Sequence, residues 1–313
     1  MKVLAPGKLL LTGGYAVLEG ARAIVCAIDR YAVASGDLPG TAQRAVSPEI
    51  TAAMEGAGAE TPHVDTSSLF SNGQKLGLGS SAAAVVAALG RVAALRGEHL
   101  GDALVRQEIF DRARAAHARV QSGGSGVDVA ASVYGGVLCY SLRAGGRPSI
   151  SPVDLPEGLH IDAYWSGHSV RTSEMRARVN RLKSRDKDLF AARMGELSAA
   201  AEAAASAIGQ GDAPRLIEAA QASERALFAL GRDADTPIVP PSVHGLVRLA
   251  EEERSAFLPS GAGGGDVFVR LGQGAPSPRF AKEAEALGLE KLDFAVDILG
   301  VHTTGKLRGE PSP

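Results

Sequence analysis

The sequence predicts a mixed α+β protein of two domains. The chain has 313 residues, which exceeds what one simple core usually organises and suits two domains of ordinary size. Short apolar runs typical of strands alternate with longer helical patterns along the chain. Hydrophobic residues make up 45% and charged residues 22% of the sequence, the balance of a folded globular protein rather than a disordered one.

The N-terminal half is expected to combine strands and helices around glycine-rich turns. Residues 1–35 predict a strand, a turn at Ala5-Pro6-Gly7, and two further strands at 8–12 and 23–28. Residues 36–62 are rich in Gly, Ala and Pro and are interpreted as short strands and loops. Helices are expected at 80–95, 104–119 and 127–134, the first with Ser80 and Ser81 as capping residues.

A domain boundary is expected near a hairpin-like stretch at 141–159, which gives domains at 1–155 and 156–313. Strands and helices alternate after it, as in an α+β or α/β domain. The expected strands are 161–165, 267–271 and 294–298, and the expected helices are 172–183, 187–208, 214–230, 241–252 and 278–287.

Charge and cysteine usage argue against several classes of protein. Lys and Arg number 33 against 35 for Asp and Glu, so no global field is available to collect nucleic acid or to hold the chain on an anionic membrane. No run of about 18 apolar residues occurs, and Lys8, Gly13 and Gly14 interrupt the N-terminal apolar residues of a would-be signal peptide. Cys26 and Cys139 are expected to be buried thiols. We therefore expect a cytoplasmic protein with a local ligand site.

The strongest local signal for chemistry is the loop at 75–83, Lys-Leu-Gly-Leu-Gly-Ser-Ser-Ala-Ala. Glycines let the backbone approach a ligand closely, and the following helix adds orphan N–H groups and the positive end of its dipole, which suits a polyphosphate. The hydroxyls of Ser80 and Ser81 are suited to phosphate oxygen or magnesium. The loop is neither a Walker A motif nor a dinucleotide fingerprint, and a plain glycine turn with serine caps stays open as the alternative.

Two further loops carry candidate residues. Asp128 follows a glycine-rich stretch and begins a helix, where it is either a capping acid or a group that orients an acceptor hydroxyl. The loop at 258–266 holds four glycines in the five positions 261–265. Such a run is a flexible linker or a backbone nest for an anion, and its position directly before a predicted strand favours the nest.

Together, the three loops resemble those of the GHMP kinase superfamily. Ala5-Pro6-Gly7-Lys8 with residues 14–18 resembles its first motif, residues 77–83 resemble the ATP loop, and residues 260–266 resemble the third motif. The resemblance implies an N-terminal domain like ribosomal protein S5 domain 2 and a ferredoxin-like C-terminal domain, with the active site between them. It also implies ATP and Mg²⁺ as cofactors and a small-molecule substrate.

Within the superfamily the chain is most similar to phosphomevalonate kinases, which implies conversion of 5-phosphomevalonate to 5-diphosphomevalonate. Residues 63–67 and 124–130, the stretch 166–169 with Thr172-Ser173, and Ala116-His117 and Asp266 carry this likeness. Gly14 and Leu258 depart from the pattern, because the family usually has glutamate and lysine at these positions. A mevalonate kinase or another small-molecule GHMP kinase stays open, as does a non-catalytic sensor of ATP and a metabolite.

The resemblance further implies the roles of individual residues. Asp128 and Lys8 would be catalytic, and Ser81 would bind magnesium. ATP would contact Lys75, Gly77, Leu78, Gly79, Ser80, Ser81 and Ala82. The substrate would contact Ser125, Gly126, Ser169, Arg171, Ser260, Gly261, Ala262, Gly263 and Gly264, and Arg171, Lys75 and His168 are candidates for its phosphate or carboxylate. No feature decides between a monomer and a homodimer.

Overall fold

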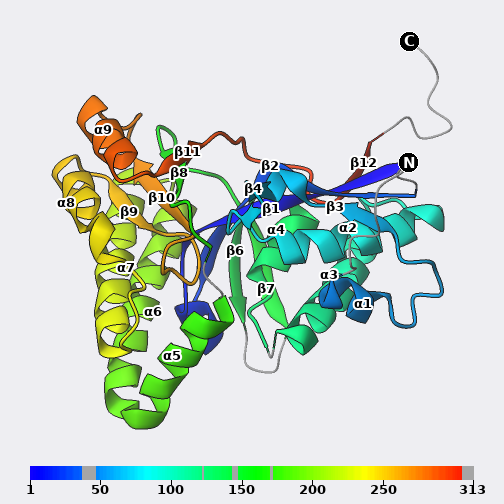
Figure 1. The fold of residues 1–313 in the computed structure, drawn as a ribbon, viewed down its shortest axis with the longest axis horizontal. Helices are drawn as coiled ribbons and strands as arrows, with labels where there is room; N and C mark the ends of the chain where they lie inside the picture. Colours follow the sequence, from blue (N-terminus) through cyan, green and yellow to red (C-terminus); the bar gives the residue numbers. More distant parts are fainter. Residues whose placement is uncertain (37–46, 122, 143–146, 170–171, 305–313) are drawn as a thin grey trace.

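A computed structural model describes residues 1–36, 47–121, 123–142, 147–169 and 172–304. These residues form an α+β fold in which a six-stranded and a four-stranded antiparallel sheet are each covered by helices (Figure 1). The α+β class that the sequence predicts is confirmed.

The first sheet has the order β12-β1-β2-β6-β7, with β3 paired beside β2. Its strands are β1 (Lys2–Thr12), β2 (Ala23–Ser35), β3 (His63–Asp65), β6 (Val137–Leu142), β7 (Pro148–Val153) and β12 (His302–Thr304). Helices α2 (Ser80–Leu95) and α4 (Val127–Tyr134) pack directly on β1 and β2. Helices α1 (Pro48–Met54) and α3 (Ala103–Val120) pack against α2 in turn. The start of α2 therefore lies over β1, the strand that carries Lys8.

The second sheet has the order β11-β8-β10-β9. Its strands are β8 (His160–Trp165), β9 (Ala256–Pro259), β10 (Val267–Gly272) and β11 (Glu290–Leu292). The helices between them are α5 (Thr172–Arg185), α6 (Lys187–Gly209), α7 (Ala213–Asp233), α8 (His244–Glu252) and α9 (Pro278–Ala286). With the helices of 172–252 taken as one layer, this is the βαββαβ arrangement of a ferredoxin-like domain, as the resemblance implies.

Short elements complete the described chain: the 3₁₀ helices η1 (Ala16–Glu19), η2 (Ser67–Leu69) and η3 (Pro241–Val243), and the hairpin of β4 (Phe70–Ser71) and β5 (Gln74–Lys75).

The two sheets share an apolar core. One cluster of buried side chains includes β1 and β2 of the first sheet together with Trp165, Ala204 and Val267 of the second half. The chain also returns to the first sheet at its end, where Lys2 of β1 pairs with Thr304 of β12. The division into domains at residue 155 stays a prediction.

Several elements differ from the sequence prediction. The expected turn at Ala5-Pro6-Gly7 lies inside the continuous strand β1, because the proline and glycine form an irregularity in the pairing with β2 rather than a reversal. Residues 48–54 are the helix α1, capped by Ser47, rather than strands and loops. The expected strand 294–298 is only an isolated bridge between Val296 and Ile28. The cap of α2 is Gly79 rather than a serine.

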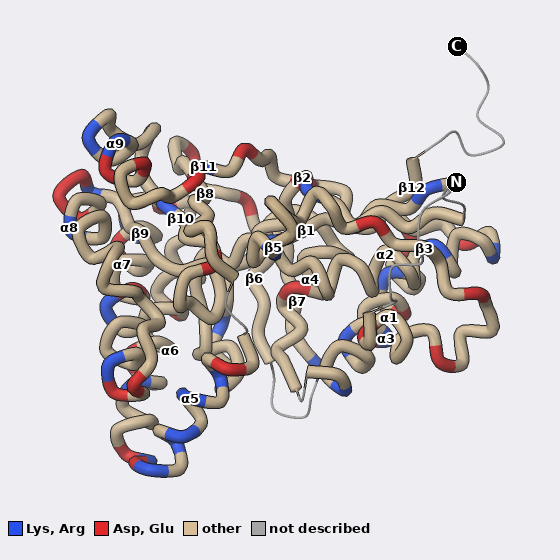
Figure 2. The backbone as a smooth tube through the Cα atoms, in the orientation of Figure 1, with Lys and Arg blue, Asp and Glu red and all other residues tan. Residues whose placement is uncertain are grey.

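Charged side chains of both signs are spread over the described chain, and the two cysteines differ in their burial. Lys, Arg, Asp and Glu are interspersed over the helices of both halves (Figure 2). Cys26 is buried and Cys139 is half-buried, and both are free thiols. Across the described ranges, no helix is both long and apolar enough to cross a membrane.

Candidate active site

Lys8 lies where the first strand meets two of the glycine-rich loops. A side-chain carbon at Gly7 would lie 2.8 Å from the Leu78 carbonyl oxygen, so glycine lets β1 come close enough for the Lys8 backbone N–H to donate to that oxygen at 2.9 Å. The Lys8 ammonium donates to the carbonyl oxygens of Gly77 at 3.3 Å and Ser260 at 3.5 Å. One ammonium therefore links β1, the loop before α2 and the loop after β9.

Lys8 is buried from water and lies under the influence of two carboxylates. Its side chain is only 8% exposed, and burial lowers the pKa of Lys8, while the negative charges of Asp128 and Asp266 act in the opposite direction. A phosphate that reached this ammonium would add a third negative charge and favour its protonated form.

A cleft of about 700 Å³ opens along the start of α2; we call it the main cleft. Lys8, Asp128, His117, Gln121, Asp266 and Glu49 line it together with Lys75, Gly77, Gly79, Ser80, Ser81, Ala82, Val120, Ser169, Thr172 and Ser173. Helix α2 begins at Gly79, which adopts the left-handed conformation (φ 79°, ψ 30°), and no side chain caps it. The N–H groups of its first turn are therefore available to an anion in the cleft.

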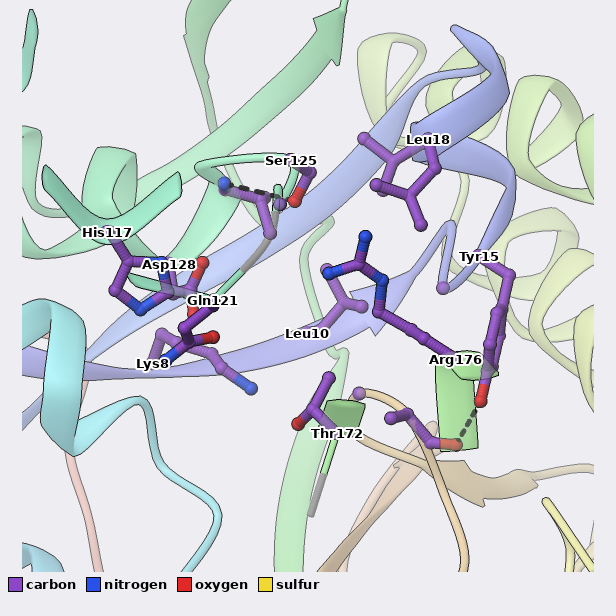
Figure 3. A pocket seen from close by; sticks show the side chains of 16 residues that line it. Lys8, Leu10, Tyr15, Leu18, His117, Gln121, Ser125, Asp128, Thr172 and Arg176 are labelled. Carbon is purple, nitrogen blue, oxygen red and sulfur yellow. Dashed lines mark hydrogen bonds between the residues drawn. The ribbon is translucent and has the colours of Figure 1, made fainter. Parts of the chain in front are cut away.

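A smaller pocket of about 130 Å³, here the side pocket, also has Lys8 and Asp128 in its wall (Figure 3). Besides these two residues it is lined by Leu10, Gly14, Tyr15, Val17, Leu18, His117, Gln121, Gly124, Ser125, Val127, Thr172, Arg176, Gly261 and Ala262. The two cavities share Lys8, His117, Gln121, Asp128 and Thr172. Molecules bound in the two cavities would therefore meet at Lys8 and Asp128.

Comparison with known proteins fits this arrangement. The GHMP kinases N terminal domain model matches residues 52–136, which include α2, α4 and Asp128. A phosphomevalonate kinase of Streptomyces sp. (strain CL190) is 27% identical, with 85% of this chain and 88% of the relative covered. A mevalonate kinase of Archaeoglobus fulgidus is 28% identical, with 91% and 97% covered. Residues 52–136 therefore belong to the GHMP kinase family, and the similarity to GHMP kinases extends along most of the chain.

The fold agrees with this assignment. The structure of Streptococcus pneumoniae phosphomevalonate kinase in complex with phosphomevalonate and AMPPNP superposes with a TM-score of 0.77 at 22% identity, covering 95% of this chain and 99% of the other. This superposition concerns the fold; the matched domain model and the two relatives support the assignment of the chain as a GHMP-family small-molecule kinase and ATP-dependent phosphotransferase.

Most predicted ATP contacts of this GHMP kinase lie in the main cleft. Lys75, Gly77, Gly79, Ser80, Ser81 and Ala82 line it. Leu78 does not, because its side chain is buried in the core while its carbonyl oxygen accepts from Lys8. Whether these residues contact ATP stays a prediction.

The predicted substrate contacts do not all lie in the same cavity. Ser125, Gly261 and Ala262 line the side pocket, whereas Ser169 lines the main cleft. Gly126 is buried and caps α4 in the left-handed conformation, close to Arg114 and Tyr140. His168 lines neither cavity. Arg171 lies outside the described residues.

The predicted anion nest at 261–265 is not formed as expected. Ser260 is buried, and its hydroxyl accepts from the backbone N–H of Leu10 at 2.8 Å. Gly263 packs on Ile238, where a side-chain carbon would lie 2.3 Å from the carbonyl oxygen, and the Gly264 N–H donates to that same oxygen at 2.9 Å. The glycines therefore serve close packing of this loop, and only Gly261 and Ala262 face the side pocket.

Arg176 and Tyr15 of the side pocket were not among the predicted site residues. The Arg176 guanidinium projects from α5 into the pocket (Figure 3) and donates to the Gly123 carbonyl oxygen at 3.0 Å. Within the described chain it forms no ion pair with a carboxylate. The Tyr15 hydroxyl donates to the Ala262 carbonyl oxygen at 2.6 Å and thereby joins the first and third motifs. Burial raises the pKa of Tyr15, so it stays a neutral donor.

The oxygen donors of the main cleft fit a magnesium ion. The hydroxyls of Ser80 and Ser81 and the carboxylates of Asp128, Asp266 and Glu49 belong to its wall, and Mg²⁺ prefers oxygen ligands. The described residues contain no group of three or more His, Cys, Asp or Glu side chains close enough to hold a metal alone. This suits an ion held by one or two protein oxygens and by the phosphates of its nucleotide.

Proposed function

We propose that this kinase transfers the γ-phosphoryl group of ATP to 5-phosphomevalonate and forms ADP and 5-diphosphomevalonate. The observation that carries the proposal is the pair of cations, Lys8 and Arg176, that line the side pocket. Phosphomevalonate has a phosphate and a carboxylate, and each must lose part of its hydration to enter the pocket. Charge-assisted hydrogen bonds from two cations compensate for that loss, with Lys8 at the reacting phosphate and Arg176 at the distal carboxylate. The similarity to the Streptomyces phosphomevalonate kinase supports the same substrate.

In the proposed reaction, ATP lies in the main cleft with its phosphates at the start of α2, and the acceptor lies in the side pocket. An oxygen of the acceptor phosphate forms a bond to the γ-phosphorus, the bond from that phosphorus to the β,γ-bridging oxygen breaks, and ADP leaves. Lys8 stabilises the charge on the transferred group from between the two cavities. Asp128 orients the acceptor, and its charge opposes the lowering of the Lys8 pKa by burial. Ser81 would hold a magnesium ion together with the nucleotide, and this ion would supply further charge neutralisation.

The two sequence departures have packing explanations in this structure. Leu258 is a buried core residue of β9. A side-chain carbon at Gly14 would lie 3.2 Å from the Gly261 carbonyl oxygen, so glycine lets the first and third motifs approach closely. Both Lys8 and Asp128 remain in place, which favours a catalytic kinase over a sensor that only binds its ligands.

An ADP-release assay with a panel of acceptors tests this proposal. We expect ADP release above the ATP-only background with phosphomevalonate, and none above that background with galactose or homoserine. ADP release with mevalonate but not with phosphomevalonate would mean that the protein is a kinase with a different acceptor. Binding of ATP and acceptor without any ADP release would support the sensor instead.

Replacing Arg176 by methionine should raise the KM for phosphomevalonate about tenfold, the effect of losing one charge-assisted hydrogen bond, with the KM for ATP nearly unchanged. Arg178→Met is the matched control, because Arg178 is exposed on the same helix and lines neither cavity. Initial rates at varied acceptor and ATP give both constants. Equal effects of the two variants, or a rise confined to the KM for ATP, would remove Arg176 from the acceptor site.

A further inference from the structure

The three carboxylates of the main cleft differ in their surroundings. Asp128 and Asp266 act on the buried Lys8. Glu49, in the first turn of α1, forms no ion pair with a lysine or arginine in the part of the chain that the structure describes. Its carboxylate oxygen instead accepts from the Gln121 amide at 3.2 Å, and Gln121 ends α3 and lines both cavities. Glu49 is thus a fixed carboxylate on the cleft wall without a strong cation beside it.

Local hydrogen bonds favour the ionised form of this carboxylate. Burial by itself would raise the pKa of Glu49, but hydrogen bonds from its own backbone N–H, Gln121 and Ser47, together with the nearby His117, hold the pKa below its ordinary value. A glutamate carboxylate is ionised at neutral pH in any case, so a negative charge is present when the cleft would receive the polyphosphate of ATP.

A fixed anion facing a polyphosphate is unfavourable unless a cation lies between them. Asp128 and Asp266 already act on Lys8, and Lys75, the other lysine of the cleft wall, forms no ion pair with Glu49 among the described residues. We infer that Glu49 binds the divalent cation that accompanies the nucleotide, across the main cleft from the serine hydroxyls at the start of α2. This inference rests on the proposed position of ATP in the main cleft.

Helix α1 holds Glu49 on the cleft wall through contacts that do not involve Glu49. The Arg119 and Arg112 side chains of α3 donate to the carbonyl oxygens of Ala52 at 2.9 Å and Ala53 at 3.3 Å. Replacing the carboxylate should therefore leave α1 docked on α3, which makes Glu49→Gln a test of charge rather than of folding.

The test is the affinity of the full-length protein for AMPPNP, measured by calorimetry with saturating Mg²⁺ and again in EDTA. Glu49→Gln should weaken binding about tenfold with Mg²⁺, because a cation ligand is lost, and should leave binding in EDTA unchanged or tighter, because a repelling charge is lost. Mn²⁺ titrated into the AMPPNP complex and followed by electron paramagnetic resonance should show the same loss of metal affinity. Thermal melting of the variant should match that of the wild type.

Two further variants distinguish cation binding by Glu49 from a purely structural role of this residue. Glu55→Gln removes an exposed carboxylate that follows the same helix and pairs with Arg119, and it should leave both affinities unchanged. Gln121→Ala removes the hydrogen bond that anchors Glu49 but keeps the charge of Glu49. It should therefore weaken AMPPNP binding in Mg²⁺ less than Glu49→Gln does. Equal losses for Glu49→Gln with and without metal, or no loss in either, would overturn the inference. Failure of the wild type to bind AMPPNP at all would overturn the position of the nucleotide itself.

Discussion

Asp128→Asn should lower kcat by about 10² or more, while the affinity for ATP changes little. The amide keeps the shape of the carboxylate but loses its charge. That charge orients the acceptor and opposes the lowering of the Lys8 pKa by burial. Because Asp128 acts to raise the pKa of Lys8, its loss lowers that pKa further. The variant should therefore lose its remaining activity at a lower pH on the alkaline side than the wild type does. Steady-state rates across pH measure both effects.

Asp266→Asn is the control for the expected shift of the alkaline limb of the pH profile. Asp266 also acts on Lys8 but lines only the main cleft, so its loss should move the alkaline limb in the same direction with a smaller decrease in kcat. Wild-type turnover in Asp128→Asn would mean that Asp128 does no more than favour the start of α4.

Gly79→Ala should weaken the binding of AMPPNP by roughly a hundredfold. Gly79 caps α2 in a left-handed conformation that costs other residues about 1 to 2 kcal/mol, and a new side-chain carbon would lie 3.0 Å from the Lys8 side chain. The substitution would thus disturb both the N–H groups that face the nucleotide and the ammonium beside them. Calorimetry with AMPPNP measures the binding directly.

Gly97→Ala is the matched control for conformational strain. Gly97 lies beyond the other end of α2, has a φ of 80°, and has no atom within 4 Å of an added side-chain carbon. Both variants should lose a similar free energy of unfolding, but only Gly79→Ala should lose nucleotide affinity. Equal nucleotide affinities in the two variants would place the phosphates away from Gly79.

Much of the fold was predictable because local patterns and packing agree. The predicted bounds of α2 and α4 match the structure, since each helix follows a glycine and continues through residues that favour helix, with Gly90 tolerated inside α2. The strand β1 was divided wrongly, because a proline and a glycine that end most strands are tolerated at an irregular pairing with β2. The helix α1 was missed because its seven residues are too few for a clear period.

The candidate site was predictable only where its residues belong to a motif. Lys8, Gly79 and Asp128 were identified from their glycine-rich surroundings, whereas Arg176 is one of several arginines on α5 and only the tertiary fold places it in the side pocket. Glu49 likewise reaches the main cleft only because α1 packs on α3. The glycines at 263–264 were misinterpreted as ligand contacts because their partner, Ile238, is distant in sequence.

The preference between two acceptors tests the proposed substrate. Mevalonate and phosphomevalonate are assayed in separate reactions, because the product of mevalonate is itself phosphomevalonate, and initial rates of ADP release at varied acceptor and saturating ATP give kcat/KM for each. If Lys8 and Arg176 accommodate both anionic groups of phosphomevalonate, its kcat/KM should exceed that of mevalonate by at least about a hundredfold, equivalent to roughly 2.7 kcal/mol. A ratio near one, or a higher kcat/KM for mevalonate, would contradict the assignment of phosphomevalonate as the acceptor.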